Sequence, residues 1–116
     1  MVHHLLDHGC QVTIVDNFRT GRWEFVPTQD VTVHYGDILN TELMMRAIDG
    51  CDWVCHFAAN PDARGERRGV DFNIQQNLMG TTSVLDAMRH VGTDRILYAS
   101  SASIYGNTTQ NPVPED

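Results

Sequence analysis

The chain has 116 residues, of which 41% are apolar and 20% charged, a size and composition that suit one globular domain and exclude disordered and fibrous classes. No apolar run reaches membrane-spanning length and no charged-then-apolar leader precedes residue 10, so we expect no membrane partner, no export signal and a cytoplasmic location. The formal net charge of −7 argues against a nucleic-acid partner.

Two residue types restrict the chemistry further. All eight basic residues are arginines, so the chain offers no lysine as a general acid or Schiff base. Its three cysteines, Cys10, Cys51 and Cys55, are an odd number without an export signal, which favours reduced thiols over a disulfide. We expect Cys51 and Cys55 to be buried thiols.

The first half of the chain is predicted to form a helix, two strands and a second helix. Residues 1–8 have the spacing of an amphipathic helix, whereas the β-branched runs at 11–16 and 31–35 are typical of buried strands. Asn40 is expected to cap the second helix, which ends near residue 50. The expected buried residues of this second helix are Leu43, Met44, Ala47 and Ile48.

The second half continues the alternation of strands and helices. A strand at 53–59 leads into a polar loop at 60–69, and a longer helix is predicted from about residue 71 to 91 before a last strand at 95–100. The expected apolar stripe of the long helix is Leu78, Val84, Leu85 and Met88. Strands that alternate with helices indicate the α/β class with a doubly wound parallel sheet.

Asp16 closes the strand at 11–16 and is the first candidate binding residue. In a nucleotide-binding βαβ unit, a carboxylate at this point accepts hydrogen bonds from the adenosine ribose hydroxyls. It repels a 2′-phosphate and therefore favours NAD over NADP, although Arg19 could offset part of that repulsion. The alternative interpretation is a solvated carboxylate that begins a turn.

Five short motifs occur in order along the chain. They are VDNF (15–18), GDI (36–38), HFAAN (56–60), NLMGT (77–81) and SSASIYG (100–106). Through these motifs the sequence resembles the extended short-chain dehydrogenase/reductase family, in particular its NAD-dependent sugar-nucleotide epimerases and dehydratases. The resemblance runs through essentially all of the chain.

The resemblance implies a set of NAD-binding residues. It gives the adenosine ribose to Asp16 and Asn17, and the adenine ring to Asp37 and Ile38. Small side chains that permit close approach of the backbone to the cofactor ribose and diphosphate are expected in a family segment that begins within the predicted strand at 53–59. The residues of that segment are Phe57, Ala58, Ala59, Asn60 and Pro61.

Three more residues take roles from the same resemblance. Ser101 corresponds to a catalytic hydroxyl that polarises the reacting oxygen of the substrate, and Ser100 beside it is expected to contact the cofactor. Asn77 would support the active site from its helix. The alternatives are ordinary turn chemistry for the serines and a packed polar residue for Asn77. Ala102 and Ser103 stand where dehydratases of the family carry an Asp-Glu pair, so epimerisation is favoured over 4,6-dehydration.

Two defining parts of the family are absent from the sequence. The glycine-rich turn belongs ahead of the helix at residues 1–8, and the catalytic Tyr-x-x-x-Lys is expected beyond Asp116. The residues four positions after Tyr35, Tyr98 and Tyr105 are Leu39, Ala102 and Thr109. We therefore expect residues 1–116 to be an internal fragment: a partial NAD-binding Rossmann domain without its first strand and without a substrate domain.

Other candidate sites are weaker. His4 and His8 stand one helical turn apart with Cys10 behind them, but no acidic residue follows His4 as in H-E-x-x-H, and we expect no metal site. Arg64 in the polar loop could reach a diphosphate, or simply face solvent with its neighbours.

The predicted function follows from the resemblance. It implies a nucleotide-sugar epimerase with transient hydride transfer to NAD, a nucleotide-sugar substrate, and a full-length enzyme that could form a homodimer. One alternative is an NAD(P)H-dependent carbonyl reductase of the same superfamily. Another is a non-catalytic nucleotide-binding Rossmann module.

Overall fold

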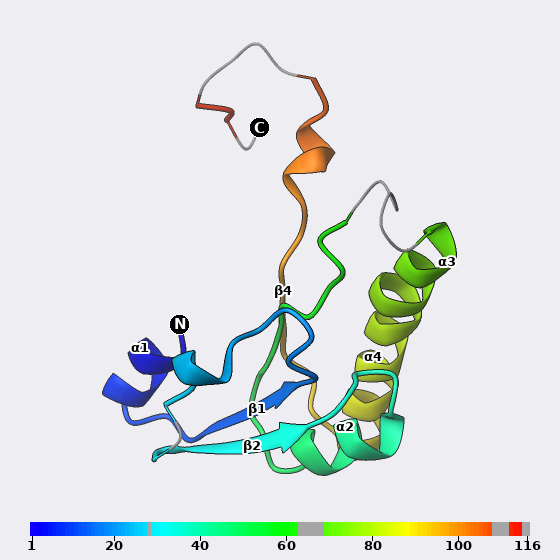
Figure 1. Cartoon of the computed structure of the whole chain (residues 1–116). Coiled ribbons are helices and arrows are strands. Elements are labelled where there is room, and N and C mark those ends of the chain that lie inside the picture. The colour runs from blue at the N-terminus through cyan, green and yellow to red at the C-terminus, as the bar shows by residue number, and fades with distance from the viewer. Residues whose placement is uncertain (28, 63–68, 108–111, 115–116) are drawn as a thin grey trace.

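The first half of the chain folds into a short helix, a pair of strands and a second helix (Figure 1). The computed structural model describes residues 1–27, 29–62, 69–107 and 112–114. The elements of this half are α1 (Val2–Asp7), β1 (Val12–Asp16), β2 (Val31–Tyr35) and α2 (Thr41–Ile48), with a 3-10 turn at Trp23–Phe25 between the two strands. All four predicted elements are confirmed, and the 3-10 turn lies between the two predicted strands.

The second half contains one long helix between two short strands. Its elements are β3 (Val54–His56), α3 (Val70–Asn73), a π-helical segment (Ile74–Met79), α4 (Gly80–Val91), β4 (Ile96–Tyr98) and a 3-10 turn (Ala102–Tyr105). The helix predicted at 71–91 is confirmed, but a π-helical segment interrupts it. The strands predicted at 53–59 and 95–100 are confirmed in place, though each is shorter than expected. None of the helices in the described ranges is long and apolar enough to cross a membrane.

The strands form two separate parallel pairs. β1 pairs with β2, with Val12 opposite Val31, and β3 pairs with β4, with Val54 opposite Ile96. Within the described residues no strand pairs with the second edge of β1 or of β3. The α/β class and the parallel pairing are therefore confirmed, and the sheet is part of a doubly wound Rossmann sheet.

A cavity of about 360 Å³ lies between the two strand pairs. Val12 and Ile14 line it from β1, Val54 and His56 from β3, and Leu5 from α1. In the doubly wound order 3-2-1-4-5-6, β1 and β2 correspond to the second and third strands, and β3 and β4 to the fourth and fifth. The cavity thus stands where the first strand of that order lies, between the second and the fourth.

The hydrophobic core is built mainly from α2 and α4. Its buried apolar residues are Ile38, Leu43, Met44, Ala47, Ile48, Val84, Ala87 and Met88. Val15 of β1, Val54 of β3 and Ile96 of β4 pack against this core from the strands. The four residues predicted to be buried on the second helix are all confirmed.

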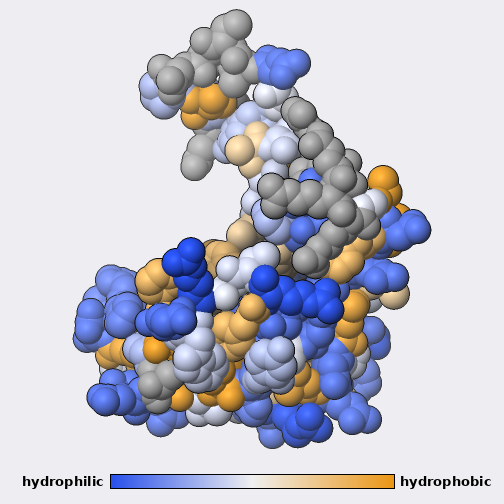
Figure 2. Space-filling view, in the orientation of Figure 1, coloured by the Kyte–Doolittle hydropathy of each residue, from blue (hydrophilic) through white to orange (hydrophobic). Residues whose placement is uncertain are grey.

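The predicted stripe on the long helix is partly wrong. Val84 and Met88 are buried, but the side chain of Leu78 is 62% exposed and that of Leu85 48% exposed. The buried face of α4 runs through Gly80, Ser83, Val84, Ala87 and Met88. This spacing follows the 3.6-residue period, whereas Leu85 lies about 100° away from Val84 and Leu78 belongs to the π-helical segment. Figure 2 shows apolar surface along this helix.

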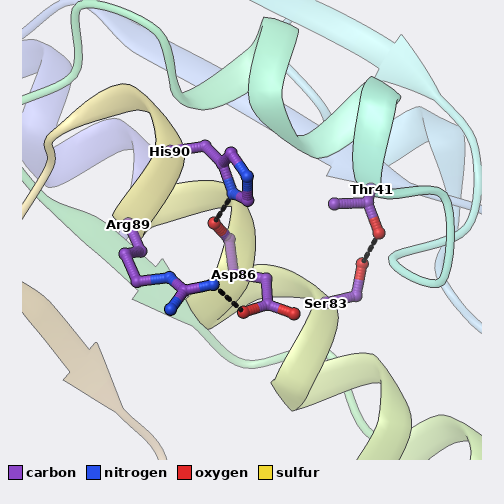
Figure 3. A network of polar contacts seen from close by, with 5 residues as sticks. All are labelled: Thr41, Ser83, Asp86, Arg89 and His90. Atoms are coloured by element: carbon purple, nitrogen blue, oxygen red, sulfur yellow. Dashed lines mark hydrogen bonds and ion pairs between the residues drawn. The ribbon is translucent and has the colours of Figure 1, made fainter.

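A polar contact connects α2 and α4 (Figure 3). The hydroxyl groups of Thr41 on α2 and Ser83 on α4 are 3.0 Å apart and share a hydrogen bond. Farther along α4, the carboxylate of Asp86 pairs with Arg89 at 3.4 Å, and its backbone carbonyl accepts from His90 Nδ1 at 2.8 Å. The Asp86–Arg89 pair is exposed and contributes little to stability, so the Thr41–Ser83 bond is the polar contact in this network that joins the two helices.

The predicted ends of α2 and α4 are confirmed. Asn40 Oδ1 accepts a hydrogen bond from the backbone nitrogen of Leu43 at 3.0 Å, which is the N-cap contact expected of asparagine. Gly92 ends α4 with φ 85°, in the left-handed region, where a residue without Cβ is favoured. Side-chain capping and glycine thus fix the two helices that carry the core.

The cysteines are free thiols, as expected, but they are not buried as expected. Cys55 is exposed and Cys51 half-buried. Cys55 lines the cavity between the two strand pairs, so its side chain is exposed on the unpaired side of β3. Partial burial, together with the nearby carboxylates of Asp52 and Asp49, raises the pKa of the Cys51 thiol.

Candidate functional site

The candidate site is a second cavity, of about 200 Å³, at the carboxyl ends of β1, β2 and β3. Parallel sheets bind ligands at this edge, outside the carboxyl ends of their strands. Eight of the residues predicted to bind a cofactor line the cavity. They are Asp16, Asn17, Ile38, Phe57, Ala58, Ala59, Asn60 and Pro61. The strands thus bring together residues that are far apart in the sequence.

Asp16 stands at the carboxyl end of β1 with its side chain oriented by the following turn. Its Oδ1 accepts a hydrogen bond from the backbone nitrogen of Phe18 at 2.7 Å, and Phe18 adopts φ 51°, which is uncommon for an aromatic residue. A Cβ placed on Gly21 would lie 3.2 Å from Asp16 Oδ2. A side chain at position 21 would therefore crowd the carboxylate of Asp16, and glycine avoids that contact.

Asn17 and Asp37 connect the turns that follow β1 and β2. Asn17 Nδ2 donates to Asp37 Oδ2 at 3.1 Å, and Asp37 Oδ1 accepts from the backbone nitrogen of Leu39 at 3.1 Å. Asp37 is not among the residues that line the cavity. Its carboxylate therefore orients Asn17, and a direct contact between Asp37 and the adenine ring stays a prediction.

The segment after β3 is held by asparagine side chains. Asn77 Oδ1 accepts from the backbone nitrogen of Asn60 at 2.7 Å, and Asn77 Nδ2 donates to the backbone oxygen of the same residue at 3.2 Å. Asn60 Nδ2 donates to Asn73 Oδ1 at 2.5 Å, and Asn73 Nδ2 donates to the backbone oxygen of Asp62 at 2.8 Å. Asn77 does not line the cavity, but it fixes a residue that does.

His56 lies beneath this segment, at the end of β3. Its side chain is only 5% exposed, and desolvation lowers the pKa of its imidazole below the ordinary value of 6.5. His56 Nε2 is 3.0 Å from Thr81 Oγ1, and Thr81 Oγ1 donates to the backbone oxygen of Asn77 at 2.6 Å. The buried imidazole is therefore connected to the helix that carries Asn77.

Sequence reasoning missed several residues of the site. Besides Arg19, further side chains and glycines line the cavity, namely Thr20, Gly21, Gly36, Phe72 and Gln76. Arg19 lies with its guanidinium 6.0 Å from the centroid of the Phe72 ring. The positioning contacts of Asn73 and Thr81 were also missed, although the four-residue spacing of Asn73 and Asn77 was a usable signal, because such pairs are neighbours on a helix.

Ser100 and Ser101 lie after β4 and do not line the described cavity. Both are exposed. Ser101 Oγ accepts from the backbone nitrogen of Ser103 at 3.2 Å and donates to Ser103 Oγ at 3.1 Å. Figure 1 shows this segment leading away from the strands. The structure therefore does not bring Ser101 together with Asp16, and the roles predicted for the two serines stay predictions.

The weaker candidates gain no support. Within the described ranges no group of three or more His, Cys, Asp and Glu side chains could hold a metal ion. His8 Nδ1 instead bonds the backbone oxygen of His4 at 2.8 Å. Arg64 lies outside the described residues.

Comparison with known proteins identifies the family. The family profile described as "NAD dependent epimerase/dehydratase family" matches residues 1–116. The UDP-glucose 4-epimerase of Corynebacterium glutamicum is 34% identical over 112 residues, which cover 97% of this chain and 34% of the relative. A 2-alkyl-3-oxoalkanoate reductase of Shewanella oneidensis is 30% identical over 100 residues, covering 86% of this chain and 24% of the relative.

A solved structure gives the same result for the fold. The UDP-glucose 4-epimerase of Thermus thermophilus, solved as a complex with NAD, superposes with a TM-score of 0.85 at 28% identity, covering 99% of this chain and 38% of that chain. This chain thus spans about a third of the length of the C. glutamicum epimerase that it matches. Because the family profile extends over every residue, the chain belongs to the NAD dependent epimerase/dehydratase family.

Proposed function

We propose that this chain is the nucleotide-binding part of an NAD-dependent nucleotide-sugar 4-epimerase. The observation that carries the proposal is the cavity at the carboxyl ends of β1, β2 and β3, with Asp16 and the segment from Phe57 to Pro61 in its lining. The names of the C. glutamicum and T. thermophilus proteins support the same activity and substrate class.

The residues of the cavity fit the adenosine end of NAD. A carboxylate at the end of β1 can accept hydrogen bonds from two ribose hydroxyls. Asp16 lines the cavity, and its Oδ2 lies beside Gly21, which has no side chain to crowd it. Ala58 and Ala59 are exposed and carry only methyl groups, so their backbone can be approached closely. The same edge would continue to the cofactor diphosphate.

In the proposed reaction, the protein supplies orientation and electrostatics, whereas NAD, when bound, supplies the hydride acceptor and donor. Asp16 would bind the adenosine ribose, and Asn17, which Asp37 orients, would bind a neighbouring hydroxyl of the same ribose. Ser101 would turn its hydroxyl from Ser103 toward the reacting oxygen of the sugar. That hydrogen bond would stabilise the charge that develops on the oxygen as its proton leaves.

The proposal extends to the wider protein. The partner would be a nucleotide sugar, bound with the help of a substrate domain outside residues 1–116, and two full-length copies could form a homodimer. The location would be the cytoplasm, where reducing conditions would keep the thiols of Cys10 and Cys55 unpaired.

A carbonyl reductase is the second candidate function. The observation in its favour is the similarity to the S. oneidensis reductase, which covers 86% of this chain. A reductase releases oxidised cofactor after each turnover, whereas an epimerase regenerates and retains it. Cofactor retention therefore distinguishes the two functions.

The test uses the full-length protein that carries this chain. The protein is purified without added nucleotide and denatured, the released cofactor is quantified, and a second sample is assayed for the interconversion of UDP-galactose and UDP-glucose. We expect bound NAD and interconversion without consumption of reducing equivalents. Consumption of NADH or NADPH with a carbonyl substrate would instead identify a reductase. Nucleotide binding without either reaction would identify a non-catalytic module.

A further inference from the structure

A chain of hydrogen bonds connects the buried end of β3 to the edge of the nucleotide cavity. It runs from His56 Nε2 to Thr81 Oγ1 at 3.0 Å, and from Thr81 Oγ1 to the backbone oxygen of Asn77 at 2.6 Å. The side chain of Asn77 then bonds both backbone polar groups of Asn60, at 2.7 and 3.2 Å. Asn60 lines the cavity, so the chain of bonds ends at the proposed ligand.

The first of these bonds has a defined direction. A threonine hydroxyl has a single proton, and that of Thr81 is donated to the backbone oxygen of Asn77. His56 must therefore donate its Nε2 proton to Thr81 Oγ1. Burial lowers the pKa of the imidazole, so the group is neutral at pH 7 and Nε2–H is the tautomer present.

A second branch fixes the same segment from α3. Asn73 Oδ1 accepts from Asn60 Nδ2, and Asn73 Nδ2 donates to the backbone oxygen of Asp62 at 2.8 Å. The Asn73 amide thus uses one donor and one acceptor. An aspartate at position 73 would keep the shape and the acceptor but lose the donor.

The segment from residue 57 to 62 lies outside the strands of the sheet, so side chains take the place of ladder bonds in fixing Asn60. The π-helical segment contributes to this arrangement because it carries Asn77, and π-helical turns occur frequently at functional sites. Loss of one bond would let the segment sample other backbone conformations. The free-energy cost of ordering the segment when the ligand binds would then lower the affinity.

We propose that His56, Thr81 and Asn73 are positioning residues, which act through Asn77 and Asn60 to hold the cavity edge in the conformation that binds NAD. The inference rests on the proposed function, because it takes NAD as the ligand of this cavity. It assigns a role in binding to three residues that need not touch the cofactor.

The test measures the NAD dissociation constant of the full-length protein and of four variants. Thr81→Val removes the hydroxyl and keeps the shape of the side chain, whereas Thr81→Ser keeps the hydroxyl. Thr82→Val is the matched control, because Thr82 Oγ1 makes the same kind of bond to the backbone oxygen of Leu78 at 3.0 Å on the exposed side. His56→Leu removes the N–H donor to Thr81 and keeps an apolar side chain at this buried position.

We expect Thr81→Val and His56→Leu to bind NAD at least tenfold more weakly, and the Thr81→Ser and Thr82→Val variants to stay within threefold of the wild type. The ¹⁵N chemical shifts of His56 should show Nε2 protonated in the wild type, as the direction of its bond to Thr81 requires. Equal NAD affinity of the Thr81→Val and Thr82→Val variants would overturn the inference and leave the proposed function standing. A wild type that binds no NAD would overturn both.

A second pair of variants keeps the inference testable if Thr81→Val does not fold. Asn73→Asp removes the donor to Asp62, and Gln75→Glu introduces the same charge on an exposed neighbouring position. NAD affinity should fall at least fivefold in the first variant and less than twofold in the second. Equal affinities in the two variants would count against the positioning role of Asn73.

Discussion

Asn17 donates a hydrogen bond from Nδ2 to Asp37 Oδ2 across 3.1 Å, and this bond joins the turns that follow β1 and β2. Asp37 thus uses Oδ2 to bind Asn17. The carboxylate of the neighbouring Asp16 accepts a hydrogen bond from the backbone nitrogen of Phe18 through Oδ1. Asp16 also lines the cavity, and Asp37 does not. Of the two carboxylates at this edge, Asp16 is therefore the one placed to meet a ligand.

We predict that Asp16→Asn weakens NAD binding about tenfold, or roughly 1.4 kcal/mol, and relaxes discrimination against NADP. The amide removes the charge that repels a 2′-phosphate, but its oxygen can still accept from Phe18. Titration of the full-length protein with each cofactor measures the effect. Asp30→Asn, at an exposed position, is the control and should change neither affinity. Unchanged selectivity in the Asp16→Asn variant would show that Asp16 does not contact the ribose.

Replacement of Ser101 by Ala should lower turnover far more than NAD affinity. One hydrogen bond to a developing oxyanion is worth about 2–4 kcal/mol in a transition state, which corresponds to a decrease in rate of roughly 30- to 1,000-fold. Steady-state epimerisation by the full-length protein, measured beside the Ser103→Ala control, checks this prediction. Turnover of the Ser101→Ala variant within threefold of the wild type would remove Ser101 from the mechanism.

Stability should depend on pH through His56. Burial lowers the pKa of its imidazole in the folded protein below the ordinary value of 6.5, so the unfolded chain binds the proton more readily. Stability associated with the neutral ring is therefore complete above about pH 6.5 and is lost as the pH falls from there toward the folded-state pKa.

Urea unfolding of the full-length protein between pH 8 and pH 5 measures this dependence. The His56→Gln variant has no titrating group at this position and serves as the reference. The difference in unfolding free energy between wild type and variant should change below pH 6.5 and be constant above it. A difference that is constant across the whole range would contradict the prediction.

Expressed alone, the 116-residue chain should neither catalyse epimerisation nor melt cooperatively as a monomer. The edges of β1 and β3 that face the cavity have no strand partner among the described residues. Each buried peptide group without a partner costs about 1–3 kcal/mol, against a total stability of about 5–15 kcal/mol for an ordinary domain. Exposed edges also favour pairing between chains.

Scanning calorimetry and sedimentation velocity test this expectation, and titration calorimetry should detect no NAD binding at millimolar ligand. A sharp two-state melt from a monomer would show that the chain closes the gap between the two strand pairs in another way. Micromolar binding of NAD by the isolated chain would lead to the same conclusion.

Much of the fold was predictable because it depends on local physical chemistry. β-branched runs predicted the strands. Asn40 and Gly92 are residue types that favour helix ends, so their positions in the sequence indicate where α2 begins and α4 ends. Leu85 was misplaced because a single helical pattern cannot show which of two adjacent apolar residues faces the neighbouring helix. That choice is made by the approach of α2, which favours the side of α4 with Ser83 and Ala87.

The candidate site was predictable where strand ends determine it and not elsewhere. Asp16 follows from its place at the carboxyl edge of a parallel sheet, and the segment after β3 was expected from the family resemblance. The contacts of Asn73 and Thr81 depend on the distance between a helix and a segment that is remote in sequence, and on a π-helical segment that propensity does not indicate. Apart from the four-residue spacing of Asn73 and Asn77, side chains that bond to distant backbone groups carry little local signal.

The π-helical segment at Ile74–Met79 also restricts how this part of the chain can change in length. A single residue corresponds to about 100° of rotation in an α-helix. A π-helical turn, with hydrogen bonds between residues five apart, holds one residue more than an α-helical turn. Deletion of one residue between 74 and 79 would therefore leave an ordinary α-helix, with Phe72 and Asn73 still at the cavity edge and Val84 and Met88 still in the core. A deletion within α4 has no extra residue to absorb it and would rotate the binding edge relative to the core by about 100°, so the π-helical segment is the place where this helix can lose a residue.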